Sequence, residues 1–552
     1  MKKADLLIKN GNILTLNHEN SEAKTVAVAK GKIIGAWEQN EPPQTEVDIT
    51  PETKVIDLKG RTMIPGFIET HNHILGYSIS RKSVDCSSPL NQSISEILER
   101  IEKQVHNTPE GEWVMGQGYD DTLLIDNRHP NRDELDQIST KHPIIIRHTS
   151  GHLAVVNSAA LSLAGIDENV KNPQGGSYGR YDNNRLNGVI YEMAAMEPVQ
   201  AVQPNPTEQD LLCDLEEGSQ EYIRQGITTN TDAAVGMMAQ GNDLNVHLRA
   251  AAEKKNPMKS QLMIMHHLLR NDGPFGGYTA EQLDQEIQQR SNGRARLDSV
   301  KMFQDGSIQG LTAALREPYY NNHNIYGELY HNQEEFNQEI ADLHKRGFRI
   351  AIHGNGDSAI GSILDGFEYA LKQYPRSDHR HRIEHVQTAT KEDLDRMDKL
   401  GVAGSFFINH VYYWGDRHEK IFLGPDRAQR INPLKDAFNR SLLFTLHSDC
   451  PITPISPLFL IWSAVNRITR EGNVLGSDQC IDVLTALRAM TIDGAKINFD
   501  EKNSGSIEKG KNADFTILSA NPLTVNAEEI KNIEILGTII DGETVYKKPQ
   551  SS

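Results

Sequence analysis

The sequence predicts an α/β protein: a (β/α)8 TIM-like barrel with a small β-sandwich built from both chain termini and an inserted subdomain after barrel strand 1. Three observations predict this fold. Short apolar strands alternate with helices through the middle of the chain, and turn-punctuated strands occupy both ends. One interval between two strands is far longer than a single βα connection needs. The chain of 552 residues has room for these parts, because a domain usually takes roughly 100–200 residues.

The two ends of the chain share one pattern. Residues 1–61 form short strand segments separated by turns such as Asn10-Gly11, and residues 498–552 repeat this pattern with turns such as Asp541-Gly542. We therefore expect the two segments to build one β-sandwich together. Two separate β appendages are the alternative.

Eight apolar segments in the middle of the chain are candidate strands, and helical patterns such as 280–289, 334–346 and 391–400 fall between several of them. Eight is the strand number of a closed (β/α)8 barrel, which would comprise 62–80 as strand 1 and 225–497 as the remainder. An open doubly wound sheet is the alternative, but no glycine-rich phosphate-binding motif follows the first strand. The eight segments are 62–69, 226–232, 260–268, 298–303, 348–353, 381–386, 401–407 and 442–447.

The long interval lies between the first two barrel strands. It contains a helix that begins at Ser93 with Glu96 three residues later, the pattern of a capping box, and an apolar strand at 143–148. We interpret 81–224 as an inserted lid or substrate subdomain. Because the loops at the carboxyl ends of barrel strands form the active-site face, the insertion is expected to cover or border the site.

Composition excludes several classes of function. The chain has 75 Asp+Glu against 57 Lys+Arg, a net charge of -18, so it lacks the basic surface that binds nucleic acid. Its longest apolar run, 458–465, is too short to cross a membrane, and its first residues lack the apolar core of a signal peptide. The 4 cysteines are far apart and fit no disulfide framework or CxxC zinc motif. We expect a cytoplasmic protein that binds neither nucleic acid nor a membrane.

Residue types that bind metals recur at the ends of the predicted barrel strands. His71 and His73 alternate on the first strand, so both side chains point the same way and can converge on one ion. Any one such residue is ordinary in a strand, but together they stand where a (β/α)8 barrel places its catalytic groups, and they suit zinc or a similar ion. The others are Lys301 on the fourth strand, His353 on the fifth, His385 on the sixth and Asp449 after the eighth.

This arrangement resembles the amidohydrolase superfamily of metal-dependent hydrolases. Longer phrases resemble its amidohydrolase-3 (YtcJ-like) branch, which includes N-substituted formamide deformylases. The resemblance covers nearly the whole chain, including the split sandwich. The phrases are GQGYDDTLL (116–124), SGHLAVVNSAAL (150–161), VKMFQDGSIQGLTAAL (300–315), AIHGNGDSAI (351–360), RIEHVQ (382–387), YYWGDRH (412–418) and LHSDCPITPISPL (446–458).

The resemblance implies a role for each ligand-type residue. One divalent metal would be held by His71, His73 and Asp449, and a second by His353 and His385. Lys301 would bridge the two metals as an N6-carboxylated lysine. Zinc is the expected metal, with one or two ions per chain, and a one-metal site beside a Lys301 ammonium ion remains the alternative.

The implied reaction is hydrolysis of a carbon–nitrogen bond, other than a peptide bond, in a small amide or N-substituted formamide. A metal-bound hydroxide would attack the carbonyl carbon, and Asp449 would shuttle the proton to the leaving amine. The HExxH motif does not occur, so a zincin protease is not indicated. The alternatives are a mononuclear deaminase or cyclic-amide hydrolase, or a catalytically inactive interaction protein. All six ligand positions are kept, which argues against the last.

Four further residues are candidate substrate contacts. His152, in the insertion, is placed to bond a substrate carbonyl, and Trp414 follows strand seven, where aromatic walls line the mouth of a site. Asp305 and Gln309 follow strand four and either contact substrate or support the ligands from behind. For His152 and Trp414 the alternatives are a structural hydrogen bond and loop packing. The expected partner is a small-molecule amide, and a homodimer is also predicted.

Overall fold

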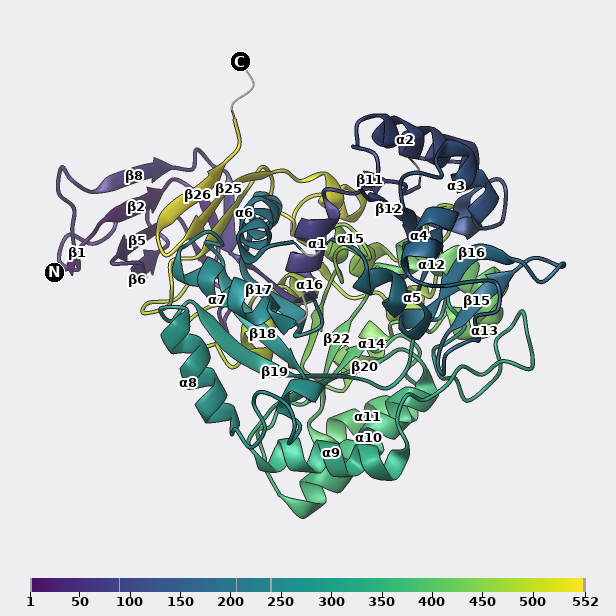
Figure 1. Ribbon diagram of the computed structural model, residues 1–552. Helices are drawn as coiled ribbons and strands as arrows, with labels where there is room; N and C mark the ends of the chain where they lie inside the picture. Colours follow the sequence, from purple (N-terminus) through teal and green to yellow (C-terminus); the bar gives the residue numbers. More distant parts are fainter. Residues whose placement is uncertain (1, 89, 205, 239–240, 550–552) are drawn as a thin grey trace. The chain divides into compact units, whose positions relative to one another are not determined.

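The computed structural model describes residues 2–88, 90–204, 206–238 and 241–549 (Figure 1). Contacts within the chain divide it into two compact units. The main unit comprises the chain up to Leu75 and from Leu211 onward, and the inserted unit is Gly76–Asp210. The second boundary falls inside helix α6 (Glu208–Arg224), whereas the boundary drawn from the sequence, 224, is the last residue of that helix.

The main unit contains an eight-stranded sheet whose neighbouring strands are all parallel and follow chain order. Its two ends are joined by backbone hydrogen bonds, from Asp449 N to His71 O (3.2 Å) and from His73 N to Cys450 O (2.8 Å). The predicted barrel is therefore confirmed. Its strands are β10 (Phe67–Asn72), β17 (Ile227–Val235), β18 (Lys259–Met265), β19 (Ala295–Phe303), β20 (Ile350–Gly354), β21 (Arg382–His385), β22 (Ala403–Phe406) and β23 (Phe444–Leu446).

Two of the helices between these strands, α8 and α11, begin at strong caps. Thr279 and Thr390 each start a helix with a reciprocal capping box, and Gly401 ends α11 in the left-handed conformation at φ 71°. None of the helices in the described ranges is long and apolar enough to span a membrane. The barrel helices include α7 (Asp243–Ala252), α8 (Ala280–Arg290), α9 (Gln333–Lys345), α10 (Asp357–Gln373), α11 (Lys391–Leu400), α12 (His410–Arg417), α14 (Leu434–Asn439) and α15 (Pro457–Asn466).

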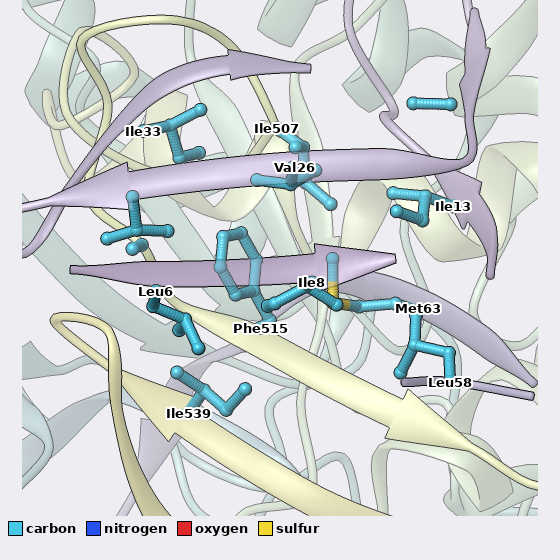
Figure 2. Packing of buried hydrophobic residues seen from close by; sticks show 13 residues of the cluster. Leu6, Ile8, Ile13, Val26, Ile33, Leu58, Met63, Ile507, Phe515 and Ile539 are labelled. Carbon is cyan, nitrogen blue, oxygen red and sulfur yellow. The ribbon is translucent and has the colours of Figure 1, made fainter. Parts of the chain in front are cut away.

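Strands from the two ends of the chain share one sheet, which Figure 1 shows as purple and yellow arrows side by side. Its order is β26-β25-β24-β9-β3-β4, and a second sheet has the order β6-β5-β2-β8. Phe515 and Ile539 pack with Leu6, Ile8 and Met63 in one buried cluster (Figure 2), so the predicted shared sandwich is confirmed. The strands are β2 (Leu6–Lys9), β3 (Asn12–Leu14), β4 (Glu22–Ala23), β5 (Thr25–Ala29), β6 (Lys32–Trp37), β8 (Lys54–Asp57), β9 (Thr62–Pro65), β24 (Phe515–Leu518), β25 (Ile535–Ile540) and β26 (Glu543–Lys547).

The segment 62–69, predicted as a single strand, forms two. β9 ends at Pro65 in the sandwich and β10 begins at Phe67 in the barrel, with Gly66 between them. A Cβ atom on Gly66 would lie 2.1 Å from Oγ1 of Thr228, so only glycine fits where the chain passes from one sheet to the other. Both strands are buried throughout, so the apolar run is continuous and hides the break.

The inserted unit has its own six-stranded sheet, with the order β11-β12-β13-β14-β16-β15. The side chain of Ser93 accepts a hydrogen bond from Glu96 N and begins helix α2 (Ile94–His106), while the expected strand at 143–148 is β13 (Ile144–His148). This unit therefore has a core of its own. The other elements are β11 (Val84–Asp85), β12 (Val114–Tyr119), β14 (Leu153–Val156), β15 (Ser177–Arg180), β16 (Leu186–Tyr191), α3 (Arg132–Ile138), α4 (Ser158–Leu163) and α5 (Glu192–Ala201).

Candidate metal centre

His71, His73 and Asp449 meet where the first and last barrel strands join. Nε2 of His71 lies 3.4 Å from Oδ1 of Asp449, and Nε2 of His73 lies 3.1 Å from the same oxygen. One nitrogen or oxygen from each of the three side chains lies within 4.8 Å of the others, as ligands of a single ion would. The backbone hydrogen bonds that join the strands thus also bring these side chains together.

The Asp449 carboxylate is charged at neutral pH. Burial alone would raise its pKa, but the nearby imidazoles of His71 and His73 outweigh burial and hold that pKa well below its usual value. Asp449 also has a left-handed backbone, at φ 53°. A non-glycine residue in this region is uncommon, and such conformations gather at functional sites.

His353 and His385 lie beside this group on the neighbouring strands β20 and β21. Their ring centroids are 4.4 Å apart, and the ring of His385 is 4.9 Å from that of His71. Nε2 of His353 lies 3.1 Å from the carbonyl oxygen of Gly306 and 2.9 Å from Nδ2 of Asn355. The two residues that the resemblance assigns to a second metal are therefore adjacent to each other and to the first group.

Lys301 is fully buried on β19. Its Nζ has no hydrogen-bond partner among the residues that the structure describes, and it lies 4.8 Å from the centroid of the Phe303 ring. Burial lowers the pKa of the amine from 10.5 to about 8, although the Glu384 and Asp449 carboxylates act in the opposite direction. A buried amine left unpaired in this way fits the ligand role, because a bound metal or carboxylation would supply the missing partner.

Sequence reasoning missed Glu384, which orients His71. Its carboxylate accepts a hydrogen bond from Nδ1 of His71, which leaves Nε2 of that ring directed at Asp449. A carboxylate bonded to the second nitrogen of a ligand histidine is the usual support of a metal site. The phrase RIEHVQ contains Glu384 directly before His385, but alternation along a strand would turn the two side chains to opposite faces. The signal is therefore visible only once the strands are assembled.

His447 is the second residue that was missed. It belongs to an additional group of metal-ligand geometry with His71 and His385. Its Nε2 lies 3.1 Å from Nδ1 of His385, and its Nδ1 lies 2.7 Å from Oγ of Ser405. The spacing His447-x-Asp449, the same H-x-ligand pattern as on the first strand, is the signal that could have identified it.

The proposed substrate contacts of the main unit are mostly buried. Asp305 is fully buried and accepts hydrogen bonds from the backbone N–H groups of Ala314, Asn355 and Gly356, so it organises the loops behind the site. Trp414 is 4% exposed and packs on the neighbouring ring of α12, that of His410. This favours the packing role for Trp414 and the supporting role for Asp305.

Gln309 and His152 have more exposed side chains. Gln309 Nε2 lies 3.4 Å from Nδ1 of His410. In the inserted unit, Nδ1 of His152 lies 2.8 Å from the Glu192 carboxylate, and about a quarter of the His152 side chain is exposed. An imidazole held in this way by one nitrogen presents the other, so His152 is suited to hydrogen-bond a ligand.

Comparisons with known proteins agree with this geometry. Residues 54–546 match the family described as "Amidohydrolase family". The chain belongs to this family. It is 29% identical to the N-substituted formamide deformylase of Arthrobacter pascens over 99% of both chains, and 27% identical to the putative amidohydrolase YtcJ of Bacillus subtilis over 98% of both. An uncharacterized metal-dependent hydrolase from Pyrococcus horikoshii OT3 has the same fold, with a TM-score of 0.73 and 24% identity over 95% of this chain and 99% of that one. The amidohydrolase resemblance and the fold are therefore confirmed.

Proposed function

We propose that this amidohydrolase cleaves a carbon–nitrogen bond in a small amide or N-substituted formamide with two divalent metal ions. The observation that carries the proposal is the buried, unpaired Lys301 amine beside two groups of ligand-type residues. The relative from Arthrobacter pascens, named as an N-substituted formamide deformylase, supports the substrate class.

The ligands divide between two positions. His71, His73 and Asp449 would hold one ion, and His353 and His385 the other, with Lys301 between them. Nitrogen and oxygen donors without thiolate suit zinc and similar divalent ions. Such ions lower the pKa of water and polarise a carbonyl group, the two needs of amide hydrolysis.

Asp449 is the proton carrier in this proposal. Its carboxylate is ionised at neutral pH, because the nearby imidazoles of His71 and His73 hold its pKa well below the usual value against the effect of burial. It would accept a proton from the attacking water and deliver it to the nitrogen of the leaving amine. Glu384 keeps His71 in one orientation throughout, because its carboxylate holds Nδ1 of that ring.

A one-metal reaction, as in a deaminase or a cyclic-amide hydrolase, is the second candidate. The group His71, His385 and His447 favours it, because these three side chains have ligand geometry for one ion without Lys301. Lys301 would then remain an amine without a metal. A homodimer and a cytoplasmic location stay predictions.

Metal analysis of the purified protein, together with a screen of N-formyl, N-acyl and cyclic amides for amine release, tests the proposal. We expect two metal ions per chain, and amine release from formamides or small amides. One ion per chain with unmodified Lys301 would refute the two-metal form, and ammonia release from an aminated ring would favour a deaminase.

An Asp449→Asn variant tests the proton transfer. We expect turnover to fall by about 10²–10⁴-fold while the metal remains bound. Asp416→Asn is the matched control. Asp416 is a buried carboxylate on α12 that accepts hydrogen bonds from Oγ1 of Thr469 and from the backbone N–H of Glu471. Retained turnover in Asp449→Asn would contradict the assigned role.

A further inference from the structure

A row of buried charges of alternating sign runs through the barrel interior and ends at His71. NH2 of Arg349 donates to Oδ1 of Asp298 (3.0 Å), and NH2 of Arg382 lies 2.9 Å from Oδ2 of the same carboxylate. Nε of Arg382 donates to Oε1 of Glu384 (2.5 Å), and the other oxygen of Glu384 accepts from Nδ1 of His71. We call Arg349, Asp298, Arg382 and Glu384 the charge row.

Folding alone does not account for the charge row. The interior of a (β/α)8 barrel is usually filled by branched apolar side chains. Arg382 is 2% exposed and Glu384 is 0% exposed, so both charges have lost their water. A buried ion pair of this kind is often no more stabilising than an apolar replacement of similar size. Stability therefore does not explain the charge row. Because the row ends at His71, a predicted metal ligand, it indicates a role at the metal site.

The two carboxylate oxygens of Glu384 have different partners, Arg382 and His71. One oxygen is bound to the guanidinium group and the other to His71, so the carboxylate cannot turn without losing one of them. Lys301 lies close enough to Glu384 for the two charges to interact, yet its Nζ has no hydrogen-bond partner in the described part of the chain. The bond to Arg382 thus favours the orientation in which Glu384 is hydrogen-bonded to His71 and makes no hydrogen bond with Lys301.

We infer that Arg382 and Asp298 are positioning residues for the metal site: they hold Glu384 on Nδ1 of His71, which directs Nε2 to the ion, and they leave the Lys301 amine available as a ligand. Asp298 anchors the guanidinium group of Arg382, and Arg349 anchors Asp298. The inference rests on the proposed metal-dependent function. Both side chains are buried, so we expect their effect to be on metal binding.

Cobalt(II) uptake by the full-length protein tests the inference without measuring activity. The affinity is measured by competition with a chelator, and the visible absorption of bound cobalt reports the ligand geometry. We expect Arg382→Met to weaken cobalt binding by roughly 10- to 100-fold and to change the absorption spectrum. Arg382→Lys, which keeps the charge, should recover part of the affinity, and Asp298→Asn should show a smaller loss than Arg382→Met.

Arg467→Met is the matched control. Arg467 is 0% exposed, like Arg382 it lies in the main unit, and its three nitrogens donate to the backbone carbonyls of Leu475, Asn432 and Ile431. This variant should lose thermal stability but bind cobalt as the wild type does.

The cobalt measurements distinguish failure of the positioning role from failure of the proposed metal-dependent function. Cobalt binding as tight as wild type in both Arg382→Met and Asp298→Asn would overturn the positioning role alone. If Arg382→Met does not fold, Asp298→Asn decides by the same measurement. A wild-type protein that binds no cobalt would instead overturn the proposed metal-dependent function.

Discussion

Replacing Lys301 by methionine should stabilise the metal-free protein. The amine is buried without a hydrogen-bond partner in the described ranges, and burial lowers its pKa from 10.5 to about 8. A pKa difference of this size between the unfolded and folded states corresponds to about 3 kcal/mol against folding wherever both states carry the proton. Methionine has a similar shape and no group to desolvate, so it removes this cost.

The advantage of the variant should depend on pH in a definite direction. Because the folded-state pKa of Lys301 is lower than the unfolded-state value, the wild type gains stability as pH rises from about 8 to 10.5. Below pH 8 the wild type bears the full cost. Between pH 7 and pH 9 the difference in unfolding free energy between Lys301→Met and wild type should therefore shrink by about 1 kcal/mol.

Urea unfolding followed by circular dichroism, with a chelator present, measures both effects. Lys259→Met is the control, because Lys259 is a largely buried barrel lysine that pairs with Asp514 and lies 3.0 Å from Asp541. Burial would lower the pKa of Lys259, but these carboxylates raise it above its usual value, so methionine there should destabilise the protein. A Lys301→Met protein that is less stable than wild type at pH 7, or whose advantage is unchanged at pH 9, would refute the reasoning.

Three further predictions concern the metals, the sandwich and acid stability. His353→Ala should lower the metal content from two ions to one per chain, and elemental analysis that still finds two would contradict the second position. Phe515→Ala should cost about 3–5 kcal/mol in urea unfolding, because the ring is fully buried in the core shared by both termini, and a loss below about 1 kcal/mol would contradict that core. Burial holds the pKa of His381 well below 6.5, so the stability contributed by the neutral ring is present above pH 6.5 and is lost as pH falls below it. A thermal unfolding series from pH 7 to pH 5 should therefore show a smaller decline for His381→Gln than for wild type, and equal declines would exclude His381 as a cause.

The strand positions of the candidate ligand residues could be predicted because two periodicities coincide. Alternation along a strand turns His71 and His73 to one side, and βα alternation places the carboxyl ends of the eight strands at one edge. The structure accordingly brings His71, His73 and Asp449 within ligand distance of one another. The fold and the closeness of these three side chains thus follow from local patterns repeated along the chain.

The residues that orient the ligands could not be predicted in this way. Glu384 reaches His71 across the barrel from a strand more than three hundred residues later in the chain, so the pair exists only in the assembled sheet. Asp305 is bonded to three backbone N–H groups of loops whose path no residue pattern encodes. Burial of Trp414 likewise depends on how α12 packs, and not on its place after strand seven.

The connection through Gly66, between the sandwich strand β9 and the barrel strand β10, has a practical consequence for anyone who modifies the ends of this protein. β9 pairs with β24 from the far end of the chain, and a single residue separates β9 from the strand that bears His71 and His73. Removing the segment after 498 would take away one of the two partner strands of β9, leaving only β3, and would loosen the start of β10. Truncations, fusions and circular permutations at the termini therefore alter the candidate metal centre indirectly, and their effect on metal content should be checked before any loss of activity is attributed to misfolding.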